Sequence, residues 1–433
     1  MATLTLRDEV TQLLQELIRV DTTNPPGNET KAAALLREYL GDNGVESELI
    51  ARVPERANLV ARLRGGEGPK LLLLSHTDVV LADRGEWSAD PFGGELRDGE
   101  VWGRGALDMK GQVAASAVAI ASLAREGFEP SGDLIFAACA DEEVGAGFGA
   151  QWLCEAHPEA VRCDFCINEG SGERVELGGN AFYLCSVAEK MSAPFRLRVL
   201  GRSGHASMPG IADNALVKAA PLIAALGAYR PERHLIPEVE ALLETVTGER
   251  PTSPDDVLER SRAVSPLLAE VVEPLLSMTL TPTMASASQK RNVVPASCDV
   301  VVDSRLLPGV TPDEQQAIVR EILGDGDYEL DSLEAHGGTR SPIETPLWAA
   351  VESWIDSVDG AARPAPICVA GFTDSHWFRE AFGTIAYGFF PSRVMDPETA
   401  ARLIHSADER VPVEDLELGV SFLRHAAVSL LSK

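Results

Sequence analysis

The sequence is poor in basic residues. Its 38 Lys and Arg residues stand against 66 Asp and Glu residues, which gives a formal net charge of −28. Nucleic-acid binding needs clustered Lys and Arg to neutralise phosphate, so this balance argues against a nucleic-acid partner. A membrane-spanning helix needs about 18 or more consecutive apolar residues, and the sequence contains no such run. We therefore expect neither a nucleic-acid partner nor a membrane partner.

Cysteine is scarce and forms no paired pattern. The seven cysteines are scattered, and only Cys163 and Cys166 make a C-x-x-C. This pair lies inside an apolar segment and lacks the second pair that a structural zinc site needs. We interpret the cysteines as buried thiols of a reducing compartment. The N-terminal residues 1–20 are charged and amphipathic, unlike a secretory signal, so we expect a cytoplasmic protein.

The chain is long enough for two domains, because 433 residues exceed one ordinary hydrophobic core. In its first part, helical periodicity alternates with short apolar runs that are typical of strands buried on both faces. This alternation predicts an α/β fold with a doubly wound, mostly parallel sheet. The expected helices are residues 7–20, 29–40, 111–125 and 150–156, and the expected strands are residues 45–50, 58–63, 71–75, 133–140 and 164–168.

The pattern changes near residue 187. Residues 194–200 alternate in a way that indicates a strand with one buried face. Further strands at 280–288 and 298–306, with helices at 214–229 and 311–323, give a β-α-β-β-α-β order around a Pro- and Glu-rich insertion at 230–273. We predict a catalytic domain made of residues 1–186 and 337–433, which includes a core strand at 384–390. Residues 187–336 would form an inserted two-layer α+β lid or dimerisation domain.

Histidine and carboxylate residues follow three of the expected buried strands. His76 and Asp78 end one strand, an Asp-Glu-Glu run at 141–143 follows another, and Glu169 follows a third. Alone, an H-x-D pair is ordinary at a surface and an acidic run is ordinary in a solvated turn. Together, at one edge of a sheet, these groups would repel one another unless a cation lay among them. The set therefore predicts a metal site.

Six segments also resemble the motifs of one enzyme family. The family contains the aminoacylases, acetylornithine deacetylases, succinyl-diaminopimelate desuccinylases and glutamate carboxypeptidases, which are hydrolases with two zinc ions. The segments come in the order typical of the family and span nearly the whole chain. They are residues 75–80 (SHTDVV), 103–111 (GRGALDMKG), 141–143 (DEE), 168–170 (NEG), 204–207 (GHAS) and 405–410 (HSADER).

The resemblance implies two bound metal ions, zinc in the first place and cobalt or manganese as alternatives. Asp108 would bridge both ions. His76 and Glu169 would complete one site, and Glu143 and His405 would complete the other. Imidazole and carboxylate groups are suitable ligands for these metals. Without the resemblance, Asp108 could equally be an aspartate that is favoured at the start of a helix.

Three further residues receive roles from the same resemblance. Asp78 would hold the His76 imidazole in the required tautomer. Glu142 would be the general base, taking a proton from the attacking water and passing it to the leaving amine. His205 would donate to the oxyanion, often from the neighbouring subunit of a dimer. A lone histidine in a Gly-rich loop is otherwise structural or solvent-exposed.

The substrate contacts are also implied by resemblance. Asn292 and Arg305 are similar to the residues that bind a substrate carboxylate, a task that suits the fork of an arginine. The alternative for Arg305 is a surface position on a strand. Thr373 lies in a GFTD segment that resembles a pocket-side G-G-T-D, with Phe372 in place of a glycine. Met191 likewise stands where a glycine is common.

We therefore expect a metal-dependent hydrolase that cleaves an amide bond beside a free carboxylate in small peptides, as a dipeptidase or carboxypeptidase does. An N-acyl-amino-acid deacylase uses the same chemistry and stays an alternative. A catalytically inactive metal-binding relative would lack a ligand or the base, yet every expected position is filled. An oxidoreductase is disfavoured because no dinucleotide fingerprint follows the first strand. The expected partners are the small substrate and, through the inserted domain, a second copy of the chain.

Overall fold

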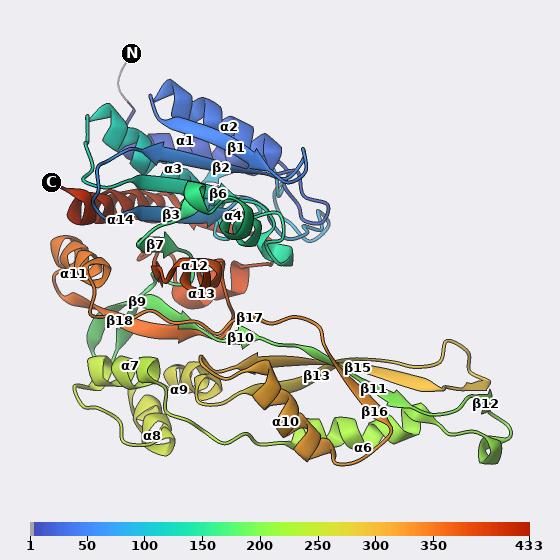
Figure 1. Cartoon of the computed structure of the whole chain (residues 1–433). Helices are drawn as coiled ribbons and strands as arrows, with labels where there is room; N and C mark the ends of the chain where they lie inside the picture. Colours follow the sequence, from blue (N-terminus) through green and yellow to red (C-terminus); the bar gives the residue numbers. More distant parts are fainter. Residues whose placement is uncertain (1–3) are drawn as a thin grey trace. The chain divides into compact units, whose positions relative to one another are not determined.

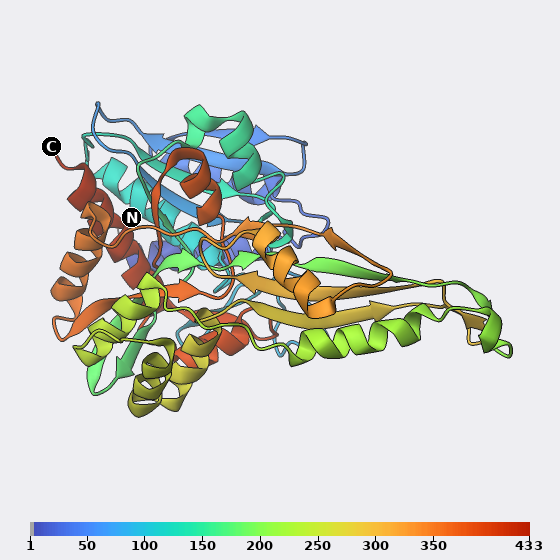
Figure 2. The ribbon, with the colours of Figure 1, turned by 60° about the horizontal axis from the view of Figure 1, so that its bottom comes forward.

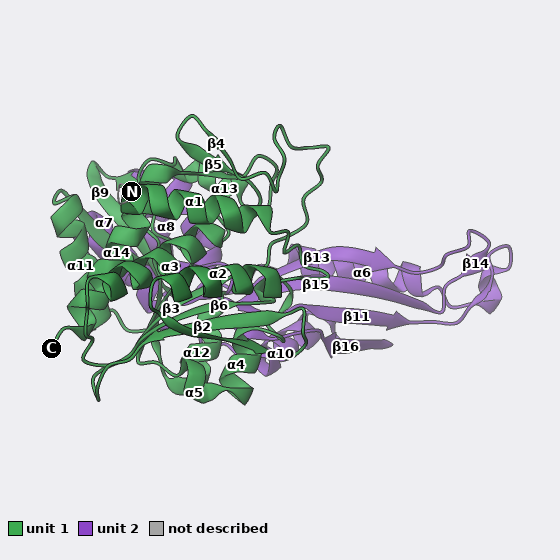
Figure 3. Ribbon diagram, turned by 90° about the horizontal axis from the view of Figure 1, so that it is seen from above, with its two compact units in different colours: residues 1–187, 341–367, 373–433 green, residues 188–340, 368–372 purple. Residues whose placement is uncertain are grey.

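The computed structural model describes residues 4–433, and within them the chain divides into two compact units (Figure 3). Within the described residues, unit 1 is formed by residues 4–187, 341–367 and 373–433, and unit 2 by Ala188–Arg340 and Cys368–Phe372. Between residues 4 and 433, no helix combines the length and the apolar character that crossing a bilayer requires.

Unit 1 is built on a nine-stranded sheet with helices on both faces (Figure 1). The order is β1-β2-β6-β3-β7-β19-β9-β18, and β8 pairs with β9. Strands β6, β3, β7 and β19 run parallel in the centre, while β1, β2 and β9 join antiparallel. The expected α/β class with a parallel central sheet is confirmed. The strands are β1 (Glu46–Ala51), β2 (Ala57–Leu63), β3 (Leu71–His76), β6 (Leu134–Cys139), β7 (Phe165–Asn168), β8 (Arg174–Leu177), β9 (Asn180–Glu189), β18 (Ala362–Val369) and β19 (Ile385–Gly388).

The two faces of this sheet carry separate hydrophobic cores. Leu71 and Leu73 of β3 pack into one cluster and Leu72 and Leu74 into the other, because successive side chains of a strand point to opposite faces. The first cluster includes helices α1 (Leu6–Arg19), α2 (Thr30–Asp42), α3 (Lys110–Arg125), α11 (Pro346–Val358) and α14 (Val413–Leu431). The second includes α4 (Ala150–Ala156), α5 (Pro158–Val161) and α12 (Ser375–Phe382), together with Cys163 and Cys166. All seven cysteines are buried free thiols, as the sequence predicts.

A small three-stranded sheet brings two distant segments of unit 1 together. β5 (Glu100–Trp102) pairs with β4 (Glu95–Arg97) on one side and with β20 (Arg410–Pro412) on the other. The chain that follows α13 (Pro397–Leu403) therefore runs beside the chain that precedes α3. Strands of three residues leave little trace in a sequence pattern, and this sheet was not predicted.

Unit 2 has an antiparallel sheet that follows the predicted β-α-β-β-α-β order. Helices α6 (Ala215–Ala228) and α10 (Pro312–Leu323) share one apolar cluster with the inward face of this sheet, and α6 lies along the long strands (Figure 2). A separate ribbon is formed by β12 (Gly204–His205) and β14 (Val293–Val294). The strands of the main sheet are β10 (Met191–Ser192), β11 (Phe195–Leu200), β13 (Thr279–Ser286), β15 (Ser297–Leu306), β16 (Tyr328–Ser332) and β17 (His336–Gly337).

The predicted insertion in unit 2 is helical. It contains α7 (Pro237–Thr247), α8 (Pro254–Val264), α9 (Pro266–Val272) and the 3-10 turn η3 (Glu273–Leu275). The buried Lys190 ammonium group donates to the carbonyl oxygens of Pro274 and Ser277, each at 2.8 Å. This lysine therefore links the end of the insertion to the start of β10.

Candidate metal centre

The candidate ligands gather at one edge of the unit 1 sheet. His76 is the last residue of β3, Glu169 directly follows β7, and residues 141–143 lie shortly after β6. These three strands are parallel neighbours, so the residues that follow them share the carboxyl edge of the sheet. Asp108 comes from the loop before α3, and His405 comes from the loop after α13.

Asp108 lies between two histidines. Its Oδ1 atom is 3.1 Å from Nε2 of His76, and its Oδ2 atom is 3.1 Å from Nε2 of His405. A carboxylate that presents each oxygen to a different imidazole has the arrangement that a ligand shared by two cations requires.

One further carboxylate accompanies each histidine. Glu169 Oε1 is 3.6 Å from Nε2 of His76, and Glu143 Oε2 is 3.3 Å from Nε2 of His405. The potential ligand atoms of each trio lie within 4.8 Å of one another, and both trios contain Asp108. The structure therefore brings all five predicted ligands together in two groups that share one carboxylate.

These side chains alter one another's protonation. Burial opposes protonation of His76, but Glu169 and Asp108 raise its pKa well above the ordinary value. Hydrogen bonds with Asp108 and Glu143 raise the pKa of His405 to about 10. Burial, reinforced by Asp108, raises the pKa of Glu169 to about 7. Carboxylates crowded at this spacing destabilise one another's charged form, which is the situation that a cation relieves.

The donor set fits divalent cations. Imidazole nitrogens and carboxylate oxygens are ligands that zinc accepts, and cobalt and manganese accept them too. Glu143 provides a second indication, because its Oε1 atom is buried and has no hydrogen-bond partner among the described residues. A buried polar oxygen without a partner is costly, and a cation beside it would remove that cost.

Asp78 anchors the loop that carries Glu142 and Glu143. Its Oδ1 accepts the amide N–H of Glu142 and its Oδ2 accepts that of Glu143, both at 3.2 Å. The His76 Nδ1 atom lies 3.0 Å from the backbone carbonyl of Asp78 and 3.5 Å from its carboxylate. Asp78 therefore contacts the imidazole, and its role in fixing the His76 tautomer stays a prediction.

Glu142 opens the short turn η1 (Glu142–Val144) beside the candidate ligands. Burial raises the pKa of its carboxyl group well above the ordinary value, and Glu169 acts in the same direction. A raised pKa favours the protonated carboxylic acid, which is the form that a general acid–base residue uses to donate a proton.

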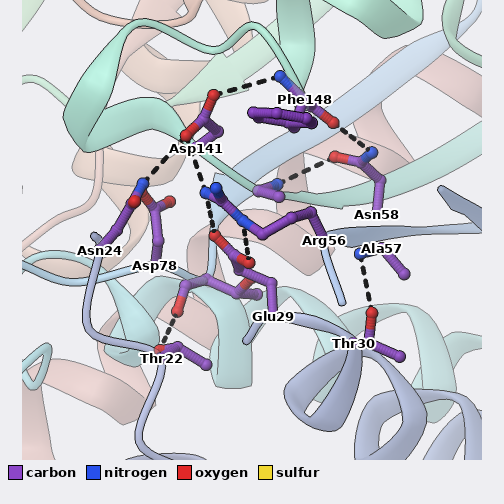
Figure 4. A network of polar contacts seen from close by, with 12 residues as sticks. Thr22, Asn24, Glu29, Thr30, Arg56, Ala57, Asn58, Asp78, Asp141 and Phe148 are labelled. Atoms are coloured by element: carbon purple, nitrogen blue, oxygen red, sulfur yellow. Dashed lines mark hydrogen bonds and ion pairs between the residues drawn. The ribbon is translucent and has the colours of Figure 1, made fainter. Parts of the chain in front are cut away.

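A buried ion-pair network supports the same loop (Figure 4). The Arg56 guanidinium donates to both carboxylate oxygens of Glu29, at 2.6 and 2.7 Å. It also donates to Asp141 Oδ1 at 2.7 Å. The Asn24 amide donates to Asp141 Oδ1 at 3.0 Å and to Asp78 Oδ2 at 2.8 Å. Asn24, Arg56 and Glu29 were not predicted as site residues, since their contacts exist only in the folded chain.

Glu409 holds the loop that carries Asp108. Its fully buried carboxylate accepts the guanidinium of Arg104 at 2.7 Å. It also accepts the backbone amides of Gly105, Leu107 and Asp108 at 3.0, 2.7 and 3.0 Å. The 405–410 motif therefore contains an anchor for the 103–111 motif, and this anchor was also missed.

Three predicted site residues, His205, Asn292 and Arg305, lie in unit 2. His205 in β12 pairs with Val293 of β14, and its Nδ1 atom lies 2.7 Å from Ser207 Oγ. Asn292 directly precedes β14, so it belongs to the same ribbon as His205. Arg305 lies near the end of β15, and two of its guanidinium nitrogens donate to Asp303 at 3.1 Å.

The two predicted carboxylate-binding residues are far apart within unit 2. β15 begins at Ser297, shortly after the ribbon that contains Asn292, and Arg305 is its penultimate residue (Figure 3). Strands rise roughly 3.3 Å per residue, so the path from Ser297 to Arg305 covers roughly 26 Å. Asn292 and Arg305 of one chain therefore cannot bind the same small carboxylate.

The GFTD segment places one further buried carboxylate, that of Asp374, near the candidate metal centre. Thr373 Oγ1 accepts the amide of Ser375 at 3.2 Å. Asp374 is buried, its Oδ2 atom lacks a hydrogen-bond partner among the described residues, and burial raises its pKa well above the ordinary value. Thr373 was predicted as a site residue and Asp374 was not, although an aspartate at the end of a family-like motif was a visible signal.

Comparisons with known proteins agree on one family. The family model described as Peptidase family M20/M25/M40 matches residues 72–429. The matched region contains all five candidate ligands and Glu142.

Two kinds of name recur among the relatives. A succinyl-diaminopimelate desuccinylase of Magnetococcus marinus is 28% identical over 397 residues, covering 87% of this chain and 90% of the relative. The N-fatty-acyl-amino acid synthase/hydrolase PM20D1 of Xenopus tropicalis is 29% identical over 369 residues, covering 81% of this chain and 70% of the relative.

A solved structure shows the same fold. The M20 family metallo-carboxypeptidase Sso-CP2 from Sulfolobus solfataricus superposes with a TM-score of 0.73 at 18% identity, covering 98% of this chain and 99% of that one. At this identity the likeness concerns the fold.

Proposed function

We propose that this chain, which belongs to peptidase family M20/M25/M40, is a metal-dependent hydrolase that cleaves a C–N amide bond beside a free carboxylate in small peptides. The observation that supports this most is Asp108, whose two carboxylate oxygens each lie 3.1 Å from a different histidine. Such a shared carboxylate could keep two cations close enough to act on one water molecule and one carbonyl group.

Two zinc ions are the proposed cofactors. His76, Asp108 and Glu169 would hold one ion, and Asp108, Glu143 and His405 would hold the other. Bound ions of this kind supply Lewis acidity toward a carbonyl oxygen and lower the pKa of water. The ligand-bearing loops are fixed through the backbone amides that donate to Asp78 and Glu409.

Glu142 is the proposed general base. Its position next to the ligand Glu143, on a turn whose amides are bound by Asp78, supports this role. Its carboxylate would accept a proton from the attacking water, and its carboxylic acid would then donate that proton to the leaving amine. The proton thus passes from the attacking water to the leaving amine through the Glu142 side chain.

A homodimer would complete the site in this proposal. His205 would donate to the oxyanion, and Asn292, Arg305 and Thr373 would contact the substrate carboxylate end. Asn292 and Arg305 are separated along β15, so both could contact one substrate only if they came from different copies of the chain.

An N-acyl-amino-acid deacylase is the second candidate. The names of the relatives favour it, since one is called a desuccinylase and another an N-fatty-acyl-amino acid synthase/hydrolase. The same ligands, base and carboxylate contacts would serve both reactions, because both break an amide bond next to a free carboxylate.

A hydrolysis panel tests the proposal. The purified chain would be incubated with dipeptides and with N-acetyl and N-succinyl amino acids, with and without added zinc, and amine release would be measured. We expect zinc-stimulated release from dipeptides. Release from acyl substrates alone would select the deacylase, and release from neither would leave an inactive metal-binding relative.

A further inference from the structure

A cavity of about 190 Å³ opens in unit 1 directly beside the candidate metal centre. Asp108 and Glu169 form part of its wall, and the remaining wall comes from residues near the start of α3, after β7, after β19, on and after α13, on β20 and on α14. An engineered protein cavity of about 150 Å³ accepts benzene. The space beside the candidate metal centre is therefore suitable for a group of that size or slightly larger.

The wall of this cavity combines apolar and acidic side chains with three neutral polar ones, Gln112, Ser171 and Ser392. Of the described residues that line it, none is a lysine or an arginine. Its carboxylates Glu173 and Asp415 are already bound. Glu173 accepts Ser171 Oγ at 2.7 Å, and Asp415 accepts three backbone amides of residues 393–395. The apolar lining residues are Leu107, Phe390, Met395, Ala400, Ile404 and Val411.

We propose that this cavity binds an uncharged apolar group on the acyl side of the scissile amide bond. The inference rests on the proposed function, in which the carboxylate on the amine side is bound by other residues. A carboxylate in the cavity would lose part of its hydration, meet no lysine or arginine of the wall and face the carboxylates of Glu173 and Asp415. The cavity therefore selects an N-terminal residue such as leucine, or an acyl chain of similar size, and rejects aspartyl and succinyl groups.

Two matched substrate pairs test this selectivity. Leu-Ala and Asp-Ala differ only in replacing two methyl groups by two carboxylate oxygens. N-(4-methylpentanoyl)-alanine and N-succinyl-alanine differ in the same way. We expect kcat/KM to be about 100-fold or more higher for the apolar member of whichever pair the enzyme cleaves. Equal or higher values for the charged members would overturn the assignment.

A cavity-filling variant locates the effect. Ala400→Leu on α13 extends into the cavity and should lower kcat/KM for Leu-Ala or N-(4-methylpentanoyl)-alanine by about 10-fold to 200-fold. Gly-Ala and N-acetyl-alanine should be cleaved as before, since their acyl groups are small. Ala349→Leu is the control, because Ala349 is an exposed residue of helix α11 that does not line the cavity. A uniform loss on all substrates, or no loss, would contradict the proposal.

A binding measurement separates this inference from the proposed function. The affinities of 4-methylpentanoate and succinate for the zinc-loaded full chain would be measured by calorimetry, with Ala400→Leu in parallel. Tighter binding of 4-methylpentanoate that is lost in Ala400→Leu supports the cavity assignment, even if no amide is cleaved. The absence of cleavage would contradict only the proposed function. Tighter binding of succinate, or no effect of Ala400→Leu, overturns the assignment whatever the catalytic result.

Discussion

Two adjacent glutamates at the candidate metal centre share one anchor but differ in their surroundings. The backbone amides of Glu142 and Glu143 both donate to Asp78, which fixes the turn. The Glu143 side chain faces His405 at 3.3 Å, as a metal ligand would. Burial raises the pKa of the Glu142 carboxyl group, as a proton carrier would need. Neighbours on one turn can therefore take separate tasks.

Replacing Glu142 should lower kcat strongly and leave metal binding unchanged. We expect Glu142→Ala to lower kcat by about 10²-fold to 10⁴-fold, the usual contribution of a general acid–base group. Metal content, measured by elemental analysis after dialysis, should stay at the wild-type level because Glu142 is not among the five proposed ligands. Glu67→Ala, in an exposed loop, should change neither quantity. A kcat that is unchanged in Glu142→Ala would remove this residue from the mechanism.

Arg56 should matter to the site beyond its contribution to stability. Arg56→Met breaks the pair with Glu29 and withdraws a donor from Asp141, which begins the loop of Glu142. Loss of one partner of a buried ion pair typically costs about 3–5 kcal/mol. Loss of an outer contact of a metal site typically lowers metal affinity or activity about 10-fold to 100-fold. Both losses are expected, and they would be measured by chemical unfolding and by zinc titration.

Arg62→Met provides the matched comparison. Arg62 lies on β2, pairs with Asp133 and donates to the carbonyl of Ala160 at 2.8 Å, away from the loop of Glu142. It should lose stability and keep zinc affinity. Equal effects of Arg56→Met and Arg62→Met on zinc affinity would show that Arg56 acts on stability alone.

The residues that the structure brings together were only partly predictable. His76, Asp108 and Glu169 could be selected because they adjoin recognisable strands or lie in family-like segments. Asn24 and Arg56 could not, since each works through hydrogen bonds to residues more than 50 positions away along the chain. No periodicity or motif encodes such a contact, and only the folded chain shows it.

At the scale of elements, regular patterns were read correctly and short or irregular ones were not. The buried strand at Leu71–His76 was expected within one residue, because a wholly apolar run leaves one interpretation for a covered strand. The helices of the insertion were not predicted, although a proline begins each of α7, α8 and α9. Proline is favoured in the first turn of a helix, so this signal was available in the sequence.

Lys190 connects this insertion to β10, and its titration should make the stability of unit 2 depend on pH in the alkaline range. Burial lowers the pKa of Lys190 to about 8, and the neighbouring Arg305 contributes while Cys368 opposes it. An exposed lysine has a pKa near 10.4. Between about pH 8 and pH 10 the unfolded chain therefore binds more protons than the folded chain, and stability due to Lys190 rises with pH.

The test compares urea unfolding of the wild type and of Lys190→Met at pH 7.5, 8.5 and 9.5. The unfolding free energy of the wild type minus that of Lys190→Met should increase as pH rises, by up to about 1.4 kcal/mol per pH unit. Lys218→Met serves as control, because hydrogen bonds with Asp213 and Asp327 raise the pKa of Lys218 instead. A flat difference for Lys190→Met would show that Lys190 does not titrate in this range.

At the scale of the whole molecule, unit 2 offers a surface for a second copy. Among residues 4–433, β13 pairs only with β15, so its other edge is unpaired. Met284 on β13 and Leu216 and Val217 on α6 are exposed by 67%, 49% and 65%. An unpaired edge beside exposed apolar side chains favours association.

We therefore expect a homodimer of twice 46.3 kDa in light scattering after size-exclusion chromatography. The double variant Met284→Lys and Val217→Lys should be a monomer that retains its zinc. Its kcat should fall sharply, because His205 and Asn292 could no longer reach a second site. A monomeric wild type with full activity would contradict both the dimer and the shared site.

Removing the proposed metal ions should show how far activity and stability depend on them. The chain carries a formal net charge of −28, and three carboxylates are crowded among two histidines at the candidate metal centre. Without cations these carboxylates repel one another, so dialysis against a chelator should abolish hydrolysis and lower the melting temperature. An ion present at 100 times its Kd stabilises the folded chain by about 2.7 kcal/mol, so each reloaded ion should raise the melting temperature in turn. Titration with zinc should saturate at two ions per chain, with Asp108→Asn reducing both the count and the rise. Saturation at one ion, or hydrolysis that survives chelation, would show that the two groups around Asp108 do not act as a pair.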